Sequence, residues 1–309
     1  MCKALSMKGI PRYGWLKMRK TGIGGSDAGA VCGLNPYSSP MKVYLDKTTE
    51  EVEDIDSETM RQGRDLEDYV ASRFEEETGK KVRRSNKMYY HDKLPFMLAD
   101  IDRLVVGEDA GLECKTVSAY NADKWKDGKI PAHYAIQCYH YMAVTGKRTW
   151  YIAAVILGKD FVYRKLDWDE AVIRSLIEIE SNFWRNHVMK KVMPDPDGSK
   201  VCDEILLQYF SSARNEEAVE LGGYKTQLDR RCELDDLIRK LETERNQIDQ
   251  NLKLALGDSQ YGQVDKYRVS WTNVETRRLD TKKMKKELPD VYDRFSVVNS
   301  SRRFSVHVA

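Results

Sequence analysis

The stretch Asp102-Arg-Leu-Val-Val-Gly-Glu-Asp-Ala-Gly-Leu-Glu113-Cys-Lys115 decides the fold class of this 309-residue chain. Two short apolar runs, Leu104 to Val106 and Gly111 to Cys114, flank a turn-rich Gly-Glu-Asp-Ala-Gly segment. Apolar runs of this length around a glycine-containing turn predict a β-hairpin. The hairpin places an aspartate at the start of its first strand and a Glu-x-Lys triplet in its second.

The same hairpin predicts a metal centre. Side chains alternate along a strand, so Glu113 and Lys115 share one face while Cys114 points to the other. Strand pairing would bring the Asp102 carboxylate opposite Glu113, and two such oxygen ligands suit Mg²⁺ or Mn²⁺. A neighbouring lysine can hold and polarise an attacking water while the metal stabilises charge on a phosphate. Because 32% of the residues are charged, an exposed hairpin with solvated charges is the alternative when this motif is taken alone.

A glycine-rich segment nearer the start of the sequence predicts an anion site. Gly22, Gly24 and Gly25 permit close backbone approach, and Ser26-Asp27 before small apolar residues predicts a helix N-cap. The unpaired N–H groups and the dipole at such a helix start favour phosphate, and Arg19 can add a bidentate contact. The alternative is an ordinary capped helix after a flexible turn.

Two expected amphipathic helices each carry a polar residue beside an apolar stripe. In the helix around Met60 to Glu77, Glu67 lies at the edge of the buried face, where a carboxylate needs a partner. In the helix from Pro131 to Thr145, Gln137 flanks a stripe that includes Tyr141. Without further evidence, Glu67 is better interpreted as an ordinary glutamate that faces water. Gln137 is equally well interpreted as a polar residue at the boundary of the buried face.

An ordered series of sequence blocks lies between residues 13 and 197. The blocks are Trp15 to Ala30, Leu34 to Pro40, Gly63 to Glu67, Phe96 to Asp102, Gly111 to Thr116 and Ala135 to Gly146. Together and in this order they resemble the YqaJ family of viral recombinases, relatives of lambda exonuclease. The resemblance implies an α/β fold of the PD-(D/E)XK nuclease type, in which a mixed central sheet is flanked by helices.

The resemblance also implies a ligand set for the metal. Asp102, Glu113 and the backbone carbonyl of Cys114 match the positions that bind Mg²⁺, for which Mn²⁺ can substitute. Glu67 matches a helix glutamate that contributes to metal binding directly or through water.

Further residues match family positions that handle the DNA. Lys115 positions the attacking water, and Gln137 matches a helix glutamine that touches this water or the scissile phosphate. Arg19 and Ser26 match the positions that hold the 5′ phosphate of a DNA end.

The chain departs from the family pattern in two places. Family members often carry Asn-Pro-Asp-Gly or Ser-Pro-Asp-Gly around the first metal aspartate, whereas this chain has Asp100-Ile101-Asp102-Arg103. Phe96 to Ala99 fix the register, so Asp102 remains the expected ligand, and Asp100 either assists the metal or is a bystander. Cys114 replaces a more usual aliphatic residue, which is tolerable because its side chain points toward the core.

The resemblance implies a phage or prophage exonuclease that digests one strand of linear double-stranded DNA from the 5′ end. Its product would be a 3′ single strand for an annealing protein, and family relatives form a ring-shaped trimer around DNA. Two alternatives stay open. One is a structure- or sequence-specific endonuclease with the same metal centre, and the other is a catalytically inactive DNA-binding scaffold.

Composition narrows the class of protein further. With 51 basic and 49 acidic residues the net charge is +2, so DNA contact should depend on a local basic lining. The six cysteines form no C-x-x-C pair, which argues against a zinc ribbon or iron–sulfur cluster and favours reduced thiols. We expect a cytoplasmic protein in a bacterial host, because no apolar run suits a membrane span or signal peptide. His133 and His140 are expected at a helix surface or boundary.

The sequence changes character after Met193-Pro-Asp-Pro-Asp-Gly-Ser199, a segment typical of a domain end. We therefore predict a nuclease domain over residues 1–199, a helical arm over 200–257 and a small, basic, β-rich appendage over 258–309. Between Leu234 and Leu252 the arm follows a short a/d pattern interrupted by Arg245. This pattern suits either an arm packed on the same chain or an intermolecular coiled coil.

The appendage is expected to hold two strands, Tyr267 to Trp271 and Phe304 to Val308, around a helix from Thr281 to Leu288. Its basic residues and interleaved aromatic side chains suit a DNA strand. The alternative is a satellite domain in which the aromatic side chains form a core of their own.

Overall fold

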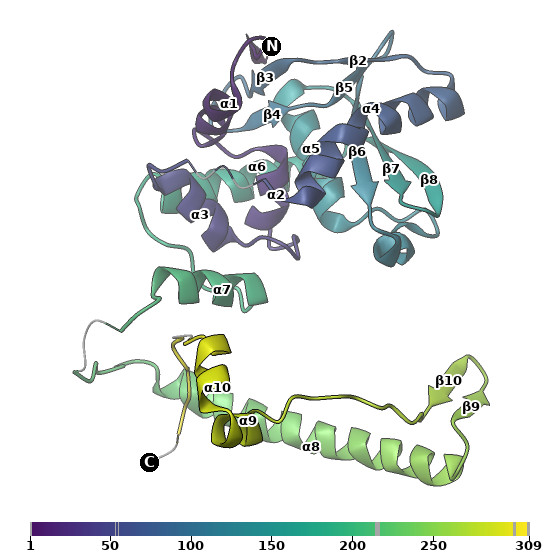
Figure 1. Cartoon of the computed structure of the whole chain (residues 1–309). Coiled ribbons are helices and arrows are strands. Elements are labelled where there is room, and N and C mark those ends of the chain that lie inside the picture. Colours follow the sequence, from purple (N-terminus) through teal and green to yellow (C-terminus); the bar gives the residue numbers. More distant parts are fainter. Residues whose placement is uncertain (1, 53, 55, 214–216, 299–300, 308–309) are drawn as a thin grey trace. The chain divides into compact units, whose positions relative to one another are not determined.

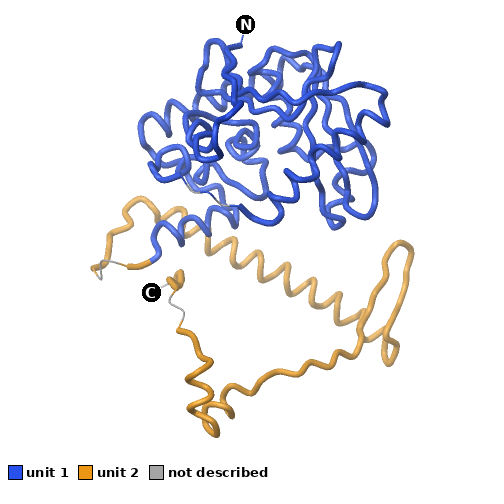
Figure 2. The backbone as a smooth tube through the Cα atoms, turned by 45° about the horizontal axis from the view of Figure 1, so that its top comes forward, with its two compact units in different colours: residues 1–211 blue, residues 212–309 orange. Residues whose placement is uncertain are grey.

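The computed structural model (Figure 1) describes residues 2–52, 54, 56–213, 217–298 and 301–307. The chain divides into two compact units, residues 1–211 and residues 212–309 (Figure 2). Within the described ranges, none of the helices has the length and apolar composition that crossing a bilayer requires.

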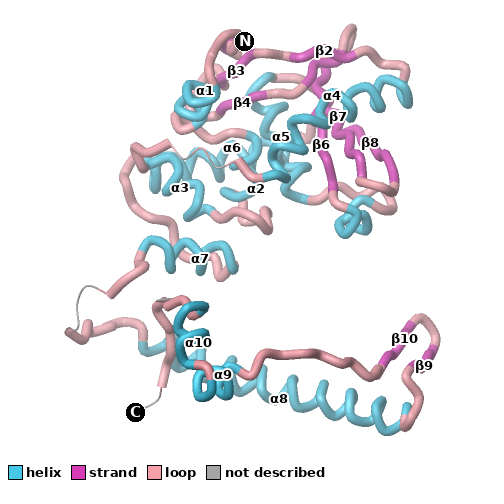
Figure 3. The backbone as a smooth tube through the Cα atoms, in the orientation of Figure 1, coloured by secondary structure: helices cyan, strands magenta, loops and turns pink. Residues whose placement is uncertain are grey.

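The first unit is built around a mixed five-stranded sheet of order β2-β5-β6-β7-β8, in which β6 and β7 run parallel. Figure 3 distinguishes its strands from the helices of the unit by colour. A second sheet has the order β1-β3-β4. The strands are β1 (Lys3–Ser6), β2 (Val82–Arg84), β3 (Lys87–Tyr90), β4 (Leu98–Asp100), β5 (Arg103–Val105), β6 (Ala110–Val117), β7 (Thr149–Ile156) and β8 (Asp160–Asp167). The helices are α1 (Arg12–Arg19), α2 (Gly25–Val31), α3 (Pro40–Thr48), α4 (Glu58–Thr78), α5 (Ala132–Thr145), α6 (Glu170–Phe183) and α7 (Lys200–Tyr209), with a 3-10 helix η1 (Ala119–Trp125) and a π-helix η2 (Trp184–Val188).

Helices cover both faces of the five-stranded sheet, because side chains alternate along its central strands. On β7, Tyr151 packs with Phe74 of α4, whereas the next residue, Ile152, belongs to the core formed with α2, α5 and α6. On β6, Leu112 faces α4 in the same way. Glu113 therefore lies on the face that α5 covers. This mixed sheet between helices confirms the predicted α/β class.

Local sequence sets the ends of the two helices that flank the site. Ser57 caps α4 by accepting a hydrogen bond from the backbone N–H of Met60 at 3.3 Å, and Gly79 ends it with φ of 70°. Helix α5 follows Pro131 and ends at Gly146 with φ of 76°. Both helices were predicted within a few residues of these bounds.

Helix α7 packs with the first unit. Cys202 and Ile205 form a small buried cluster with Met41 of α3. Residues 200–211 thus belong to the unit that contains the sheet, whereas the sequence placed a boundary at residue 199.

The second unit contains a long helix, a hairpin and two short helices. No residue of the long helix is buried, and the apolar seam between Leu234 and Leu252 is exposed in the chain. These elements are α8 (Lys225–Leu256), β9 (Tyr261–Val264), β10 (Tyr267–Ser270), α9 (Thr281–Glu287) and α10 (Pro289–Phe295).

One predicted strand in the second unit is wrong. Residues 304–307 have no regular structure, and Val308 lies outside the described residues. Alternation alone does not make a strand, because its backbone groups need a pairing partner. Among the described elements, β10 pairs with β9 and the stretch at 304–307 pairs with neither.

Candidate metal centre and active site

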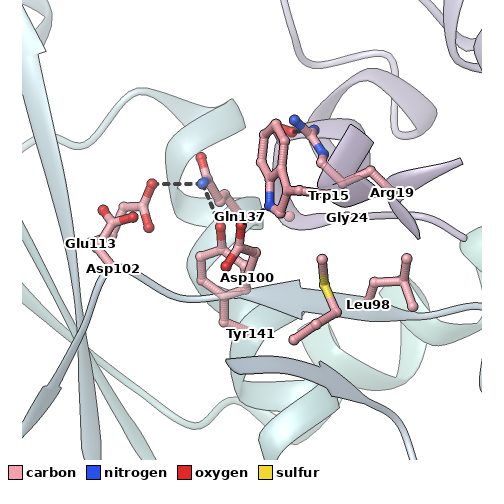
Figure 4. A pocket seen from close by; sticks show the side chains of 12 residues that line it. Trp15, Arg19, Gly24, Leu98, Asp100, Asp102, Glu113, Gln137 and Tyr141 are labelled. Atoms are coloured by element: carbon pink, nitrogen blue, oxygen red, sulfur yellow. Dashed lines mark hydrogen bonds between the residues drawn. The ribbon is translucent and has the colours of Figure 1, made fainter. Parts of the chain in front are cut away.

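The predicted hairpin forms and brings the two acidic residues together. Strands β5 and β6 pair in antiparallel fashion. The backbone N–H of Cys114 donates to Asp102 Oδ2 at 2.8 Å, which holds this carboxylate beside Glu113 (Figure 4). Lys115 Nζ lies 2.6 Å from Glu113 Oε1, so these two side chains share one face of β6 as expected.

Gln137 connects helix α5 to this pair. Its Nε2 donates to Glu113 Oε1 at 2.6 Å and to the Tyr141 hydroxyl at 2.8 Å. Its Oε1 accepts a hydrogen bond from Lys115 Nζ at 3.0 Å. Because both ends of the amide are engaged, its orientation is fixed, and Gln137 contacts Glu113 and Lys115 directly.

The two carboxylates are held where negative charge is costly. Burial, together with the neighbouring Glu113 and Glu67 carboxylates, raises the pKa of Asp102 well above its usual value. Burial also raises the pKa of Glu113, although the Lys115 ammonium opposes that shift. Glu113 Oε2 is buried and has no hydrogen-bond partner among the residues that the structure describes. A divalent cation fits this set of donors, because it would neutralise the carboxylates and use the unpartnered oxygen.

Lys115 stays a cation in this setting. Burial opposes its charged form, but the Glu113 and Asp102 carboxylates prevail and raise the pKa of Lys115 above its usual value. Its Nζ also lies 4.7 Å from the centroid of the Tyr134 ring, a cation–π contact. Lys115 can therefore orient a water or stabilise negative charge at neutral pH, but it cannot accept a proton there.

Glu67 lies near the acidic pair but is bound to another partner. Its Oε1 accepts a hydrogen bond from the buried guanidinium of Arg103. Within the described parts of the chain, no three His, Cys, Asp or Glu side chains converge as a metal site. Asp102 and Glu113 thus form the acidic pair, and Glu67 sits one contact away from it.

One cavity of about 170 Å³ joins the acidic pair to the predicted phosphate anchor. Asp102 and Glu113 line it at one end and Arg19 at the other (Figure 4), and Ser26 is also among its lining residues. Arg19 Nη2 donates to Ser26 Oγ at 2.6 Å, so the two proposed phosphate contacts lie together. The other lining residues are Trp15, Gly24, Gly25, Met88, Leu98, Asp100, Gln137 and Tyr141.

Trp15 and Asp100 join the site inside this cavity. Trp15 Nε1 donates to Asp100 Oδ2 at 2.6 Å, and the Arg19 guanidinium carbon lies 4.9 Å from the centroid of the Trp15 ring. Burial raises the pKa of Asp100, and the hydrogen bond from Trp15 opposes the shift. Trp15 was not predicted as a site residue. Trp15 lies four residues before Arg19, so both side chains lie on one side of α1. This spacing could have predicted Trp15 as a site residue.

Helix α2 begins earlier than predicted. Gly24 is its N-cap, and Asp27 accepts a hydrogen bond from the Gly24 backbone N–H at 3.0 Å. Asp27 also forms an ion pair with Lys47 at 2.8 Å. The predicted cap at Ser26-Asp27 is therefore wrong, because Gly24 supplies the extended cap residue and the Asp27 carboxylate, three residues later, accepts a hydrogen bond from its backbone N–H. Ser26 is left in the first turn with its hydroxyl at the cavity.

A buried pair, His140 and Glu180, packs next to the site. The prediction that His140 lies at a helix surface or boundary is therefore wrong. His140 and Glu180 are both fully buried, with Nδ1 and Oε1 2.7 Å apart. The other ring nitrogen contacts the backbone oxygen of Leu98 at 2.7 Å, which links α5 and α6 to the strand that carries Asp100. The sequence feature that could have predicted this pair is Glu180, because a carboxylate within the apolar stripe of α6 needs a buried partner.

A mixed sheet flanked by helices, with an aspartate opposite Glu-x-Lys on a central hairpin, defines a protein of the PD-(D/E)XK nuclease fold. The model of the YqaJ-like viral recombinase domain matches residues 14–148. The chain is 36% identical over 301 residues to the Bacillus subtilis (strain 168) protein called "Uncharacterized protein YqaJ", covering 96% of this chain and 94% of that protein. The chain belongs to the YqaJ family.

Solved structures show the same fold. The alkaline exonuclease LHK-Exo in complex with dAMP superposes with a TM-score of 0.51 at 20% identity, covering 64% of this chain and 97% of that chain. A second structure of this exonuclease, from Laribacter hongkongensis, gives a TM-score of 0.50 at 19% identity over the same shares.

Proposed function

We propose that this chain is a metal-dependent phage or prophage exonuclease that degrades one strand of linear double-stranded DNA from the 5′ end. The observation that carries the proposal is the single cavity with an acidic pair at one end and Arg19 with Ser26 at the other. A nuclease that cuts near a DNA end needs both a cutting centre and a contact for the terminal phosphate. The family's viral recombinase domain and the alkaline exonuclease with the same fold support this choice.

In this proposal Asp102, Glu113 and the backbone carbonyl of Cys114 hold Mg²⁺, which Mn²⁺ can replace. Glu67 assists through water from its place against Arg103. The bound metal supplies Lewis-acid stabilisation of charge on the scissile phosphate.

The chain's own residues then position the water and the phosphate. Lys115, kept cationic by the carboxylates, holds the attacking water and faces the developing negative charge. Gln137 fixes Lys115 and Glu113 relative to each other and would contact the water or the phosphate.

Arg19 and Ser26 set the direction of digestion. A guanidinium and a hydroxyl 2.6 Å apart suit a terminal phosphate, which would seat the 5′ end in the cavity. The product is a 3′ single strand, and we propose a phage annealing protein as its recipient and a ring-shaped trimer as the assembled enzyme.

The decisive experiment is Mg²⁺-dependent digestion of linear duplex DNA labelled at the 5′ or the 3′ end, with closed circular DNA beside it. We expect release from 5′ ends, no cutting of circles, and loss of activity in Lys115→Ala. The matched control is Lys165→Ala, since Lys165 is half exposed and pairs with Asp167 away from the cavity. Nicking of circles would instead indicate an endonuclease, and binding without metal-dependent cutting would indicate a scaffold protein.

A further inference from the structure

Arg103 places a buried positive charge directly beside the acidic pair. It is 3% exposed and directly follows Asp102 in the sequence. A buried guanidinium needs oxygen acceptors for its N–H groups, and these acceptors show what the residue does.

The guanidinium binds three oxygen atoms. Nη1 donates to Glu67 Oε1 and to the backbone oxygen of Asp102, the latter at 2.9 Å. Nη2 donates to Asp68 Oδ1 at 2.5 Å. Carboxylate and backbone carbonyl oxygens are also the ligands that Mg²⁺ takes. Arg103 thus occupies a set of oxygen atoms, next to the acidic pair, of the kind that divalent cations bind.

Arg84 holds Asp68, one of the acceptors of Arg103, from the solvent side. Arg84 Nη2 donates to the other oxygen of Asp68 at 2.6 Å, so Asp68 is held on both sides. The Arg103 side chain is 4% exposed, whereas that of Arg84 is 54% exposed. A desolvated guanidinium held by three oxygen atoms is not readily displaced by a solvated metal ion.

We propose that Arg103 is a positioning residue that acts as a fixed cation, keeps Glu67 out of direct metal coordination and limits the centre to one divalent ion. This inference rests on the proposed function, in which Asp102 and Glu113 bind that ion. Without Arg103, Glu67, Asp68 and the Asp102 backbone oxygen would face one another with no cation between them, and a second divalent ion would bind there.

The test is a count of Mn²⁺ ions bound to the full chain without DNA, by isothermal titration calorimetry and by electron paramagnetic resonance of free Mn²⁺. We expect one ion in the wild type and two in Arg103→Met. The double variant Arg103→Met with Glu67→Gln should return to one ion, because it removes the released ligand. Arg103→Lys, which keeps the charge, should hold one ion.

Arg84→Met is the matched control, since the side-chain hydrogen bonds described for Arg84 both go to Asp68. Its count should stay at one. Two ions in the wild type, or one ion in a folded Arg103→Met protein, would overturn the inference. If Arg103→Met does not fold, Glu67→Gln decides, because a lower count there would show that Glu67 is a direct ligand.

Failure of the proposed function has a different signature. A wild type that binds no Mn²⁺, or one ion that is retained in Asp102→Asn, would overturn the metal centre itself. The ion counts need no DNA cleavage, so a chain that binds one Mn²⁺ but does not cut DNA would leave the role of Arg103 supported.

Discussion

At the scale of single residues, the raised pKa values of Asp102 and Glu113 make metal binding depend on pH. A protonated carboxyl is a poor ligand, so protons and the metal compete for the same oxygens. We expect Mn²⁺ affinity to rise with pH up to tenfold per pH unit for each proton released, and to level off above the ordinary carboxylate range. Calorimetric titrations between pH 5 and pH 8 measure this. A flat profile would contradict the buried, mutually repelling pair.

The same repulsion predicts that Asp102→Asn stabilises the metal-free protein. An acid with a raised folded-state pKa holds its proton longer when folded than when unfolded. Folding stability therefore falls as pH rises from the ordinary value through the raised one. Asparagine removes this loss and can still accept the hydrogen bond from Cys114. We expect a gain of about 1 kcal/mol in unfolding free energy at pH 8.

Chemical denaturation with chelator present, at pH 5 and pH 8, checks the gain, which should be larger at pH 8. Added Mg²⁺ is the internal control, because it should stabilise the wild type and not the variant. If the unfolding free energies of the wild type and Asp102→Asn depended equally on pH, the raised pKa of Asp102 would be contradicted.

Residue-level prediction from sequence succeeded where spacing is local. Strand alternation placed Glu113 and Lys115 on one face without knowledge of the rest of the chain. The contact of Glu67 with Arg103 was not predicted, because it joins two segments whose approach depends on how α4 packs on the sheet. The cap of α2 was misassigned because Ser26, Asp27 and Gly24 are all accepted at helix starts.

At the scale of elements, the contact between α2 and α5 sets the shape of the cavity. A Cβ added at Gly25 would lie 2.5 Å from Cε1 of Tyr141. Gly25→Ala should therefore push the helices apart, cost about 1–3 kcal/mol and lower the rate on 5′-phosphorylated ends. The control is Gly63→Ala in α4, where an added Cβ would meet no described atom within 4 Å beyond its chain neighbours and the helix's own backbone. It should stabilise the protein by about 1 kcal/mol, since alanine favours helix.

Thermal unfolding and initial rates compare the two glycine variants. Equal stability of both proteins would contradict the close approach seen at Gly25.

The buried pair of His140 and Glu180 fixes α6 against α5. Removing one partner of a buried ion pair leaves the other uncompensated, so Glu180→Ala should lower the unfolding free energy by about 3–5 kcal/mol. Glu178→Ala, on the exposed side of the same helix, should change it by less than about 0.5 kcal/mol. Denaturant titrations of both variants are the measurement. A small effect at Glu180 would show that the pair contributes little to stability.

Most elements of the first unit could be predicted because their signals are local. Local sequence features indicate the turn at Gly107, the helix end at Gly146 and the apolar stripes of α4 and α5. The strand expected near Phe304 failed because strands depend on partners that local pattern does not supply.

At the scale of the whole molecule, every candidate site residue lies in the first unit. Every buried residue of the described chain also lies at or before Ile205. We therefore expect residues 1–211 alone to fold cooperatively and to retain metal-dependent DNA cleavage. Circular dichroism melting and the end-labelled DNA assay test this. An unfolded or inactive fragment would show that the second unit is needed for the structure or chemistry of the first.

The sequence identified the family at this scale because several weak blocks occur in one order. It could not assign the second unit a role. Its long helix exposes an apolar seam that suits either a partner or its own chain, and composition alone does not distinguish the two.

The parallel pairing of β6 with β7 has a consequence for the timing of folding. The register sets Glu113 opposite Ile152, and helix α5 lies between them in the sequence. A strand pair that needs such a crossover closes late, since the loop must be ordered before the contact can form. During synthesis, a chain whose β7 is still inside the ribosome already contains Asp102 and Glu113. It lacks the strand that pairs with β6 and fixes the position of Glu113. Nuclease activity should therefore appear only after β7 has left the ribosome, so incomplete chains should not cut DNA.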